Sequence, residues 1–136
     1  MANGAYNIIK KAMEQANFDW GASSWKAVLV GTGYTPNFST DTVIGDLGAN
    51  VIGSAVTLAG NAVSSAAIVS ANSATFTGVS SGLTVKAVVV YFDNGSLTRL
   101  AFYYDTGSGF PYTTTGSNIT VDWNNTPTAG NLMQLV

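Results

Sequence analysis

The spacing of apolar residues changes once along the chain, from a helical period at the N-terminus to strand-like alternation after it. Near the N-terminus, apolar side chains recur with the period of one helix face at Tyr6, Ile9, Met13 and Ala16. This spacing predicts a helix over about residues 4–16, with Asn3 as its N-cap. We expect the apolar stripe to pack on a sheet of the same chain. Docking on a neighbouring subunit is the alternative, because helices at chain ends serve either role.

The rest of the chain indicates short strands separated by Gly, Ser, Asn and Pro. A strand is predicted at Trp25–Val30, and Gly31, Gly33 and Pro36 end it. A long loop over residues 34–50 follows, with one helical turn at 41–44. Further strands are predicted over residues 50–58, 61–70, 74–78, 84–92, 97–104, 117–123 and 132–136. The apolar final strand is expected to be paired in a sheet or buried in an interface, since a free apolar edge favours aggregation.

The strongest local signal is Asn94–Gly95, which lies between two alternating segments. It is typical of a two-residue type I′ hairpin turn, whose central residues need positive φ. Such a turn pairs Phe92 with Leu97, Val90 with Arg99, Val88 with Ala101, and Lys86 with Tyr103. The uncharged face, which begins at Val85, then faces the core. The other face carries Lys86, Arg99 and Tyr103 and points outward or to a partner.

These elements predict a mainly β fold: an antiparallel β-sandwich or partly open barrel with one short N-terminal α-helix. The chain has 136 residues, so we expect a single domain over 1–136 that buries about two-thirds of its surface. Residues 51–69 are uncharged and long enough to span a bilayer. Their frequent Gly, Ser, Thr and Asn residues favour strands instead, and no membrane partner is expected.

The composition excludes several classes of catalytic and metal-binding site. The chain has no Cys and no His, so it offers no thiol nucleophile, no imidazole base and neither of the usual zinc ligands. Five Lys and Arg face seven Asp and Glu, a net charge of -2, which argues against nucleic acid as a partner. No two carboxylates are placed as a glycosidase pair by the sequence. We therefore predict a protein that is not an enzyme and has no catalytic residues and no cofactor.

Two motifs match the sequence patterns of known binding sites only in part. Gly31-Thr32-Gly33 opens like a dinucleotide loop, but Pro36 stands where the third glycine belongs and no helix is predicted after it. A calcium loop starting at Asp41 would place Val43 and Gly45 at ligand positions, and neither has a side-chain oxygen. We expect Asp41 to cap a helical turn and Asp46 to form a turn, and no metal site is predicted.

Several short segments, taken in order, resemble one family. They are Met1–Tyr6, Phe18–Trp20, Trp25–Val30, Tyr34–Pro36, Val88–Asp93, Gly109–Pro111 with Gly116, and Ile119–Trp123. Together they resemble a family of small virion structural proteins of tailed bacteriophages, several of which are similar to capsid decoration (cement) proteins. This chain departs from the family pattern in its uncharged residues 47–85 and its tight turn after Asp93. The family has no catalytic motif to transfer.

The resemblance implies a structural protein on the outer surface of the phage head that stabilises contacts between capsomers. It implies the major capsid protein as partner, a homo-oligomer such as a trimer, assembly in the host cytoplasm and a final location in the virion. A head–tail connector or tail component is the alternative, and a sugar-binding module using Trp20, Trp25 and Trp123 is a third hypothesis. The candidate partner interface is Lys86, Arg99 and Tyr103, followed by the helix stripe of Tyr6, Ile9 and Met13.

Overall fold

The computed structural model describes most of the chain, and its fold is mainly β. The described residues are 4–14, 19–21, 24–63, 68–105, 110–121, 124–125, 128–129 and 131–134. The helical elements are α1 (Asn7–Glu14) and a 3₁₀ segment, η1 (Ile44–Asn50). The strands are β1 (Gly4–Ala5), β2 (Trp25–Gly31), β3 (Val51–Thr57), β4 (Ala62–Val63), β5 (Ile68–Ser70), β6 (Ala74–Phe76), β7 (Thr84–Asp93), β8 (Thr98–Tyr104), β9 (Tyr112–Thr113), β10 (Ile119–Val121), β11 (Asn124–Asn125), β12 (Thr128–Ala129) and β13 (Asn131–Gln134).

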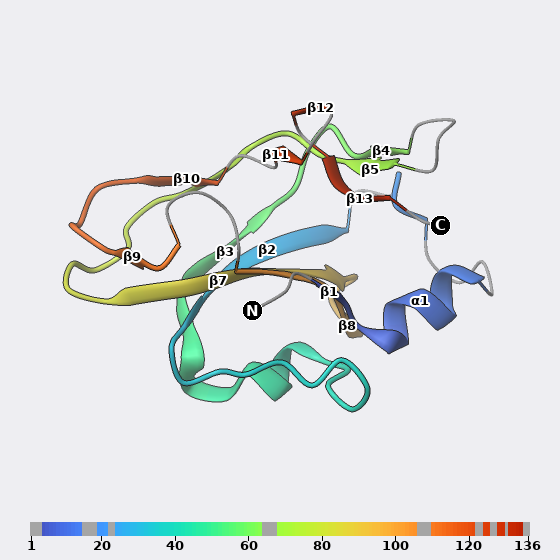
Figure 1. The fold of residues 1–136 in the computed structure, drawn as a ribbon, viewed down its shortest axis with the longest axis horizontal. Helices are drawn as coiled ribbons and strands as arrows, with labels where there is room; N and C mark the ends of the chain where they lie inside the picture. Colours follow the sequence, from blue (N-terminus) through green and yellow to red (C-terminus); the bar gives the residue numbers. More distant parts are fainter. Residues whose placement is uncertain are drawn as a thin grey trace.

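A six-stranded antiparallel sheet forms the centre of the molecule. Its strand order is β1-β8-β7-β2-β3, and β9 pairs with the first residues of β7. Three small sheets lie over one face: β10 with β6, β11 with β12, and β13 with β5 and β4. Figure 1 shows them above the main sheet, with the 34–50 segment below it. The expected sandwich-like, antiparallel architecture is therefore confirmed, and the main sheet is not closed into a barrel.

The strand predictions hold over most of the chain. Residues 61–70 are an exception, because the single strand predicted there is two short strands, β4 and β5, that pair with each other. The predicted strand at Trp25–Val30 is β2, and residues 50–58 contain β3. The predicted final strand lies at β13 and pairs with β5, so this end of the chain is paired in a sheet. Trp123 and the last two residues lie outside the described part of the chain.

Both faces of the main sheet are buried, which corrects the expectation of an outward hairpin face. An upper core, between the main sheet and the small sheets, includes Trp25, Leu29, Val88, Phe102 and Phe76. A lower core lies between the main sheet and the 34–50 segment. It consists of Tyr6, Val28, Val30, Tyr34, Leu47, Ala87, Val89, Tyr91, Leu100 and Tyr103.

The hairpin register was predicted wrongly by two residues at the turn. Phe92 pairs with Arg99 instead of Leu97, and a bulge shifts the pairing again so that Val90 faces Phe102. The cause is the Asn94 side chain, whose Oδ1 accepts hydrogen bonds from the Ser96 and Leu97 backbone N–H groups at 3.0 and 2.8 Å. This side chain closes a four-residue connection in place of the expected two-residue turn.

The N-terminal helix is shorter than predicted. It begins at Asn7 and not near residue 4, because Gly4 and Ala5 pair with β8 as a short strand. The predicted cap, Asn3, lies outside the described residues. Tyr6 and Ile9 are fully buried, so the apolar stripe packs on the sheet of its own chain, as expected.

The helical turn predicted at 41–44 lies three residues later, at η1. The Asp46 carboxylate explains the shift, since its Oδ2 accepts the Thr42 and Val43 backbone N–H groups at 2.7 and 2.9 Å. Asp46 thus forms the turn expected of it. Asp41 does not cap a helix, because its Oδ2 instead accepts the Asn37 N–H at 2.9 Å.

Candidate functional site

The two edges of the main sheet differ, and this difference defines the candidate surface. The β8 edge is covered along its length by two other segments of the chain. Near one end, the Tyr6 N–H donates to Ala101 O at 2.9 Å, beside the β1 pairing. Further along, the Leu100 N–H donates to Thr42 O at 2.9 Å. The backbone groups of this edge are therefore used within the molecule.

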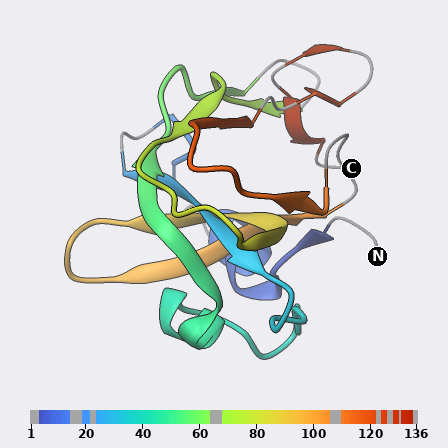
Figure 2. The ribbon, with the colours of Figure 1, turned by 90° about the vertical axis from the view of Figure 1, so that its left-hand side faces the viewer.

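The opposite edge is β3, for which β2 is the one strand neighbour in the described sheet. Figure 2 looks onto this side of the molecule, with β3 in green. Most of β3 is exposed, and the strand lies within residues 47–85, which carry no charged side chain. Natural edge strands are commonly protected by charges or by bulges. This edge has a bulge: Gly53–Ala55 lie opposite the single residue Val28, and Gly53 has a φ of 71°.

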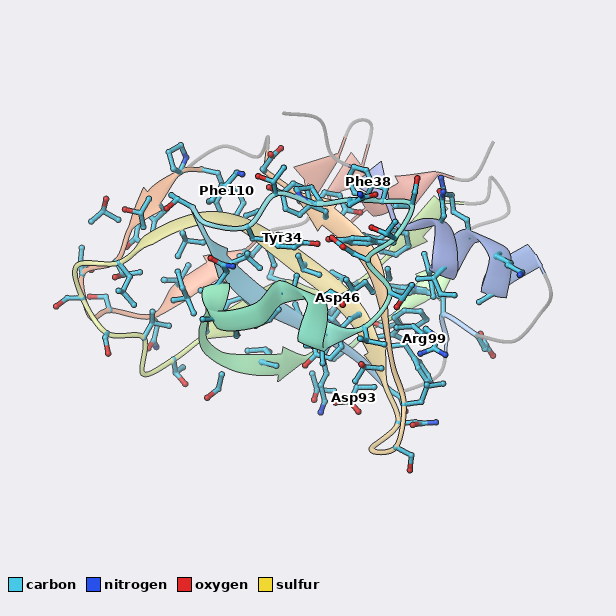
Figure 3. All side chains as sticks on the ribbon, turned by 90° about the horizontal axis from the view of Figure 1, so that it is seen from below. Tyr34, Phe38, Asp46, Asp93, Arg99 and Phe110 are labelled. Carbon is cyan, nitrogen blue, oxygen red and sulfur yellow. The ribbon has the colours of Figure 1, made fainter. Side chains whose placement is uncertain are left out.

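A buried hydrogen-bond chain fixes the segment that covers the lower core. The Tyr6 and Tyr34 hydroxyls are 2.7 Å apart, and the Tyr34 hydroxyl donates to Asp41 Oδ2 at 2.7 Å. Lys86 Nζ donates to Tyr34 O at 2.9 Å, so β7 is bonded to the same segment. Figure 3 views the molecule from below, so Tyr34 and Asp46 lie on the near side of the sheet in that picture. No spacing signal in the sequence predicts the contact between Tyr6 and Tyr34.

The two tyrosine hydroxyls of this chain are protonated at physiological pH. Burial raises the pKa of Tyr6 above its usual value. Burial, and then the hydrogen bonds to Tyr6 and Asp41, raise the pKa of Tyr34 still further. Both phenols therefore stay neutral at physiological pH and offer no phenolate as a nucleophile or base.

An ion pair holds the turn end of the β7–β8 hairpin against β2. Lys26 Nζ on β2 lies 3.0 Å from Asp93 Oδ2, and the other Asp93 oxygen accepts the Gly95 N–H at 2.8 Å. These contacts lower the pKa of Asp93, the Gly95 bond first and Lys26 second. They raise the pKa of Lys26. Figure 3 shows Asp93 and Arg99 near this end of the hairpin.

The candidate interface residues do not form one surface. Tyr103 is fully buried, so the structure corrects its placement on an outward face. Tyr6 and Ile9 are also fully buried within the chain, in line with the expectation that the helix stripe packs on the sheet. Lys86 and Arg99 are half-buried, and the Arg99 guanidinium donates to Thr98 O at 2.9 Å. Arg99 pairs with a residue six positions beyond Lys86 on β7, which separates them by about 20 Å along the strand. The Met13 side chain lies outside the described side chains.

Two of the three tryptophans that a sugar-binding module would use, Trp20 and Trp25, are in the upper core, and Trp123 lies outside the described residues. Trp25 is fully buried and Trp20 is 3% exposed, with their ring centroids 4.7 Å apart. Trp25 Nε1 donates to Asp19 O at 3.0 Å. Neither ring offers an open face on which a sugar could stack, and core packing was the use expected for Trp25.

No family model, curated protein or solved structure matches the chain. Within the described residues, no group of three or more acidic side chains is placed to hold a metal ion. In the same part of the chain, no helix has both the length and the apolar content needed to span a bilayer.

Proposed function

We propose that this chain is a non-enzymatic structural protein of a tailed-phage virion, and specifically a decoration protein that binds the major capsid protein on the outer surface of the head. In this proposal it binds as a homo-oligomer and stabilises contacts between capsomers. It is assembled onto the head in the host cytoplasm.

The observation that carries the proposal is the exposed, uncharged β3 edge beside a sheet buried on both faces. A sheet packed on both faces is a rigid platform, and an exposed edge presents backbone donors and acceptors to a partner strand. The ordered segments that resemble phage virion proteins support the same function. The covered β8 edge leaves β3 as the side of the main sheet on which an attachment surface fits best.

The cations contribute to this proposal as two separate contacts. Lys86 and Arg99 are far apart, so each would meet its own acidic group on a capsid subunit. Buried pairs of this kind contribute to affinity, whereas solvated ones contribute little.

Addition of the purified protein to undecorated heads of a phage that carries this gene tests the proposal. We expect saturable binding and heads that resist heat or denaturant better than undecorated heads do. Lys86→Ala and Arg99→Ala, tested singly, report on each contact, and their circular dichroism spectra control for folding. Saturation at only the few copies of one ring on the particle axis would favour the connector alternative. Absence of binding would contradict the proposal.

A further inference from the structure

The tip of the β7–β8 hairpin holds Asn94–Gly95, one of two Asn–Gly bonds in the chain; the other is Asn3–Gly4. An Asn–Gly bond is chemically vulnerable, because glycine has no Cβ to keep its nitrogen away from the preceding carboxamide. Asn94 and Gly95 are both exposed, and no atom lies near the place where a Cβ on Gly95 would stand. Solvent therefore reaches this bond.

The reaction at such a bond is deamidation. The Gly95 amide nitrogen loses its proton to hydroxide and attacks Asn94 Cγ, which forms a new N–Cγ bond. The Cγ–Nδ2 bond breaks, and the side-chain nitrogen leaves as ammonia with a proton from water. Water then opens the resulting succinimide to aspartate or isoaspartate. Nothing is oxidised or reduced, and the product carries one more negative charge than Asn94.

The hairpin holds both reacting groups in hydrogen bonds. The Gly95 N–H donates to Asp93 Oδ1 at 2.8 Å, so the proton that must leave is held by a carboxylate. The negative charge of Asp93 also disfavours a second negative charge on the neighbouring nitrogen. The Asn94 carboxamide is held by the Ser96 and Leu97 N–H groups. Rotation of the carboxamide toward Gly95 has to break these bonds.

Asp93 is itself held in place from the neighbouring strand. Its second oxygen, Oδ2, pairs with Lys26 Nζ at 3.0 Å, and its backbone N–H donates to Ser24 O at 2.8 Å. The Asp93 side chain is 20% exposed, in contrast to the exposed residues of the tip. The carboxylate therefore links the hairpin tip to β2.

We propose that Asn94 is a latent deamidation site that Asp93 guards: the bond converts only in molecules whose hairpin tip has opened. This inference does not depend on the proposed function. Opening of the tip exposes the Gly95 N–H to solvent and frees the carboxamide, and the rate then follows the population of the open state.

The test is incubation of the intact protein at mildly alkaline pH, followed by peptide mass spectrometry for a gain of one dalton. Asn94 and Asn3 fall in different peptides, so Asn3 serves as an internal reference for the reactivity of each sample. We expect the conversion of Asn94 to be at least about tenfold slower in the folded protein than in concentrated urea, because only open tips react. Equal rates at Asn94 in the two conditions would overturn the proposal.

Two variants distinguish protection by the Asp93 carboxylate from a general effect of hairpin stability. Asp93→Ala removes the acceptor of the Gly95 N–H, and Lys26→Met removes the same ion pair while keeping that acceptor. We expect Asp93→Ala to accelerate conversion severalfold in the folded protein and Lys26→Met to have a clearly smaller effect. Equal acceleration by both variants would assign the protection to the ion pair and overturn the role of Asp93.

Discussion

The Tyr6 and Tyr34 hydroxyl oxygens lie 2.7 Å apart although 28 positions separate them in the sequence. Their contact joins the residue that precedes α1 to the segment that covers the lower core. Because Tyr34 also donates to Asp41, its hydroxyl links the residue before α1 to a second point of this segment. The Asn7 N–H, which donates to Phe38 O at 2.7 Å, joins the same two parts of the chain. This connection explains how a long segment with little regular structure forms a stable cover over the sheet.

We expect Tyr34→Phe to lower the free energy of unfolding by about 1–3 kcal/mol, because it leaves the buried Tyr6 hydroxyl without its acceptor and the Asp41 carboxylate without this donor. Tyr6→Phe should cost less, since the bond from Tyr34 to Asp41 survives. Urea unfolding of the two variants and the wild type gives the comparison. Equal losses would show that the bond to Asp41 contributes nothing measurable.

Neighbouring valines on β7 test whether both faces of the sheet are buried. Val88 belongs to the upper core and Val89 to the lower core, and each is fully buried. Val88→Ala and Val89→Ala should each cost about 2 kcal/mol or more, from two lost methyl groups and the cavity that they leave. The exposed Leu97 is the control, and Leu97→Ala should change stability by about 0.5 kcal/mol at most. A stable Val89→Ala variant would mean that the lower face is open.

Acid should weaken the 34–50 segment through Asp46. Backbone N–H groups of Val43 and Thr42 lower the pKa of Asp46 in the folded protein. A lowered pKa stabilises the fold above the unfolded pKa of about 3.9, and this contribution disappears as the pH falls through the folded pKa. In Asp46→Asn, stability measured by urea unfolding should fall less steeply below about pH 4 than in the wild type. Parallel curves for the two proteins would contradict this role of Asp46.

The alternating and apolar patterns predicted most strands correctly, because the spacing of apolar residues within a strand reflects which faces of that strand are buried. They did not predict the second buried face. Val88–Tyr91 is an uninterrupted apolar run, which is typical of a strand covered on both sides. The cations Lys86 and Arg99 favoured an exposed face instead. Both residues lie near the ends of the hairpin pairing, where their side chains are only half-buried.

The remaining differences have local causes that the residue pattern alone does not determine. The Asn94–Gly95 pair is compatible with a two-residue turn and with a four-residue connection. The hydrogen bonds that Asn94 Oδ1 accepts from backbone N–H groups select the four-residue connection. The start of α1 depends on a pairing with β8 almost a hundred residues away. The exposed β3 edge had one signal in the sequence, the absence of charge over residues 47–85.

A lysine on the β3 edge should block attachment without harming the fold. Ala55 is exposed within the bulge of β3, and a charged side chain on an edge strand opposes pairing with another chain. We expect Ala55→Lys to lower the affinity for undecorated heads about tenfold or more and to leave the unfolding midpoint close to that of the wild type. Thr115→Lys, at an exposed position outside the strands, is the charge-matched control. Equal affinities of the two variants would remove β3 from the attachment surface.

The amount of this chain in purified particles tests the central proposal most directly. Particles of a phage that carries the gene are purified by density gradient, and the ratio of this chain to the major capsid protein is measured by quantitative mass spectrometry. A decoration protein that covers the head should be present in numbers comparable to those of the capsid subunits. Absence of the chain from the particles, or only the few copies of a single ring, would contradict the account.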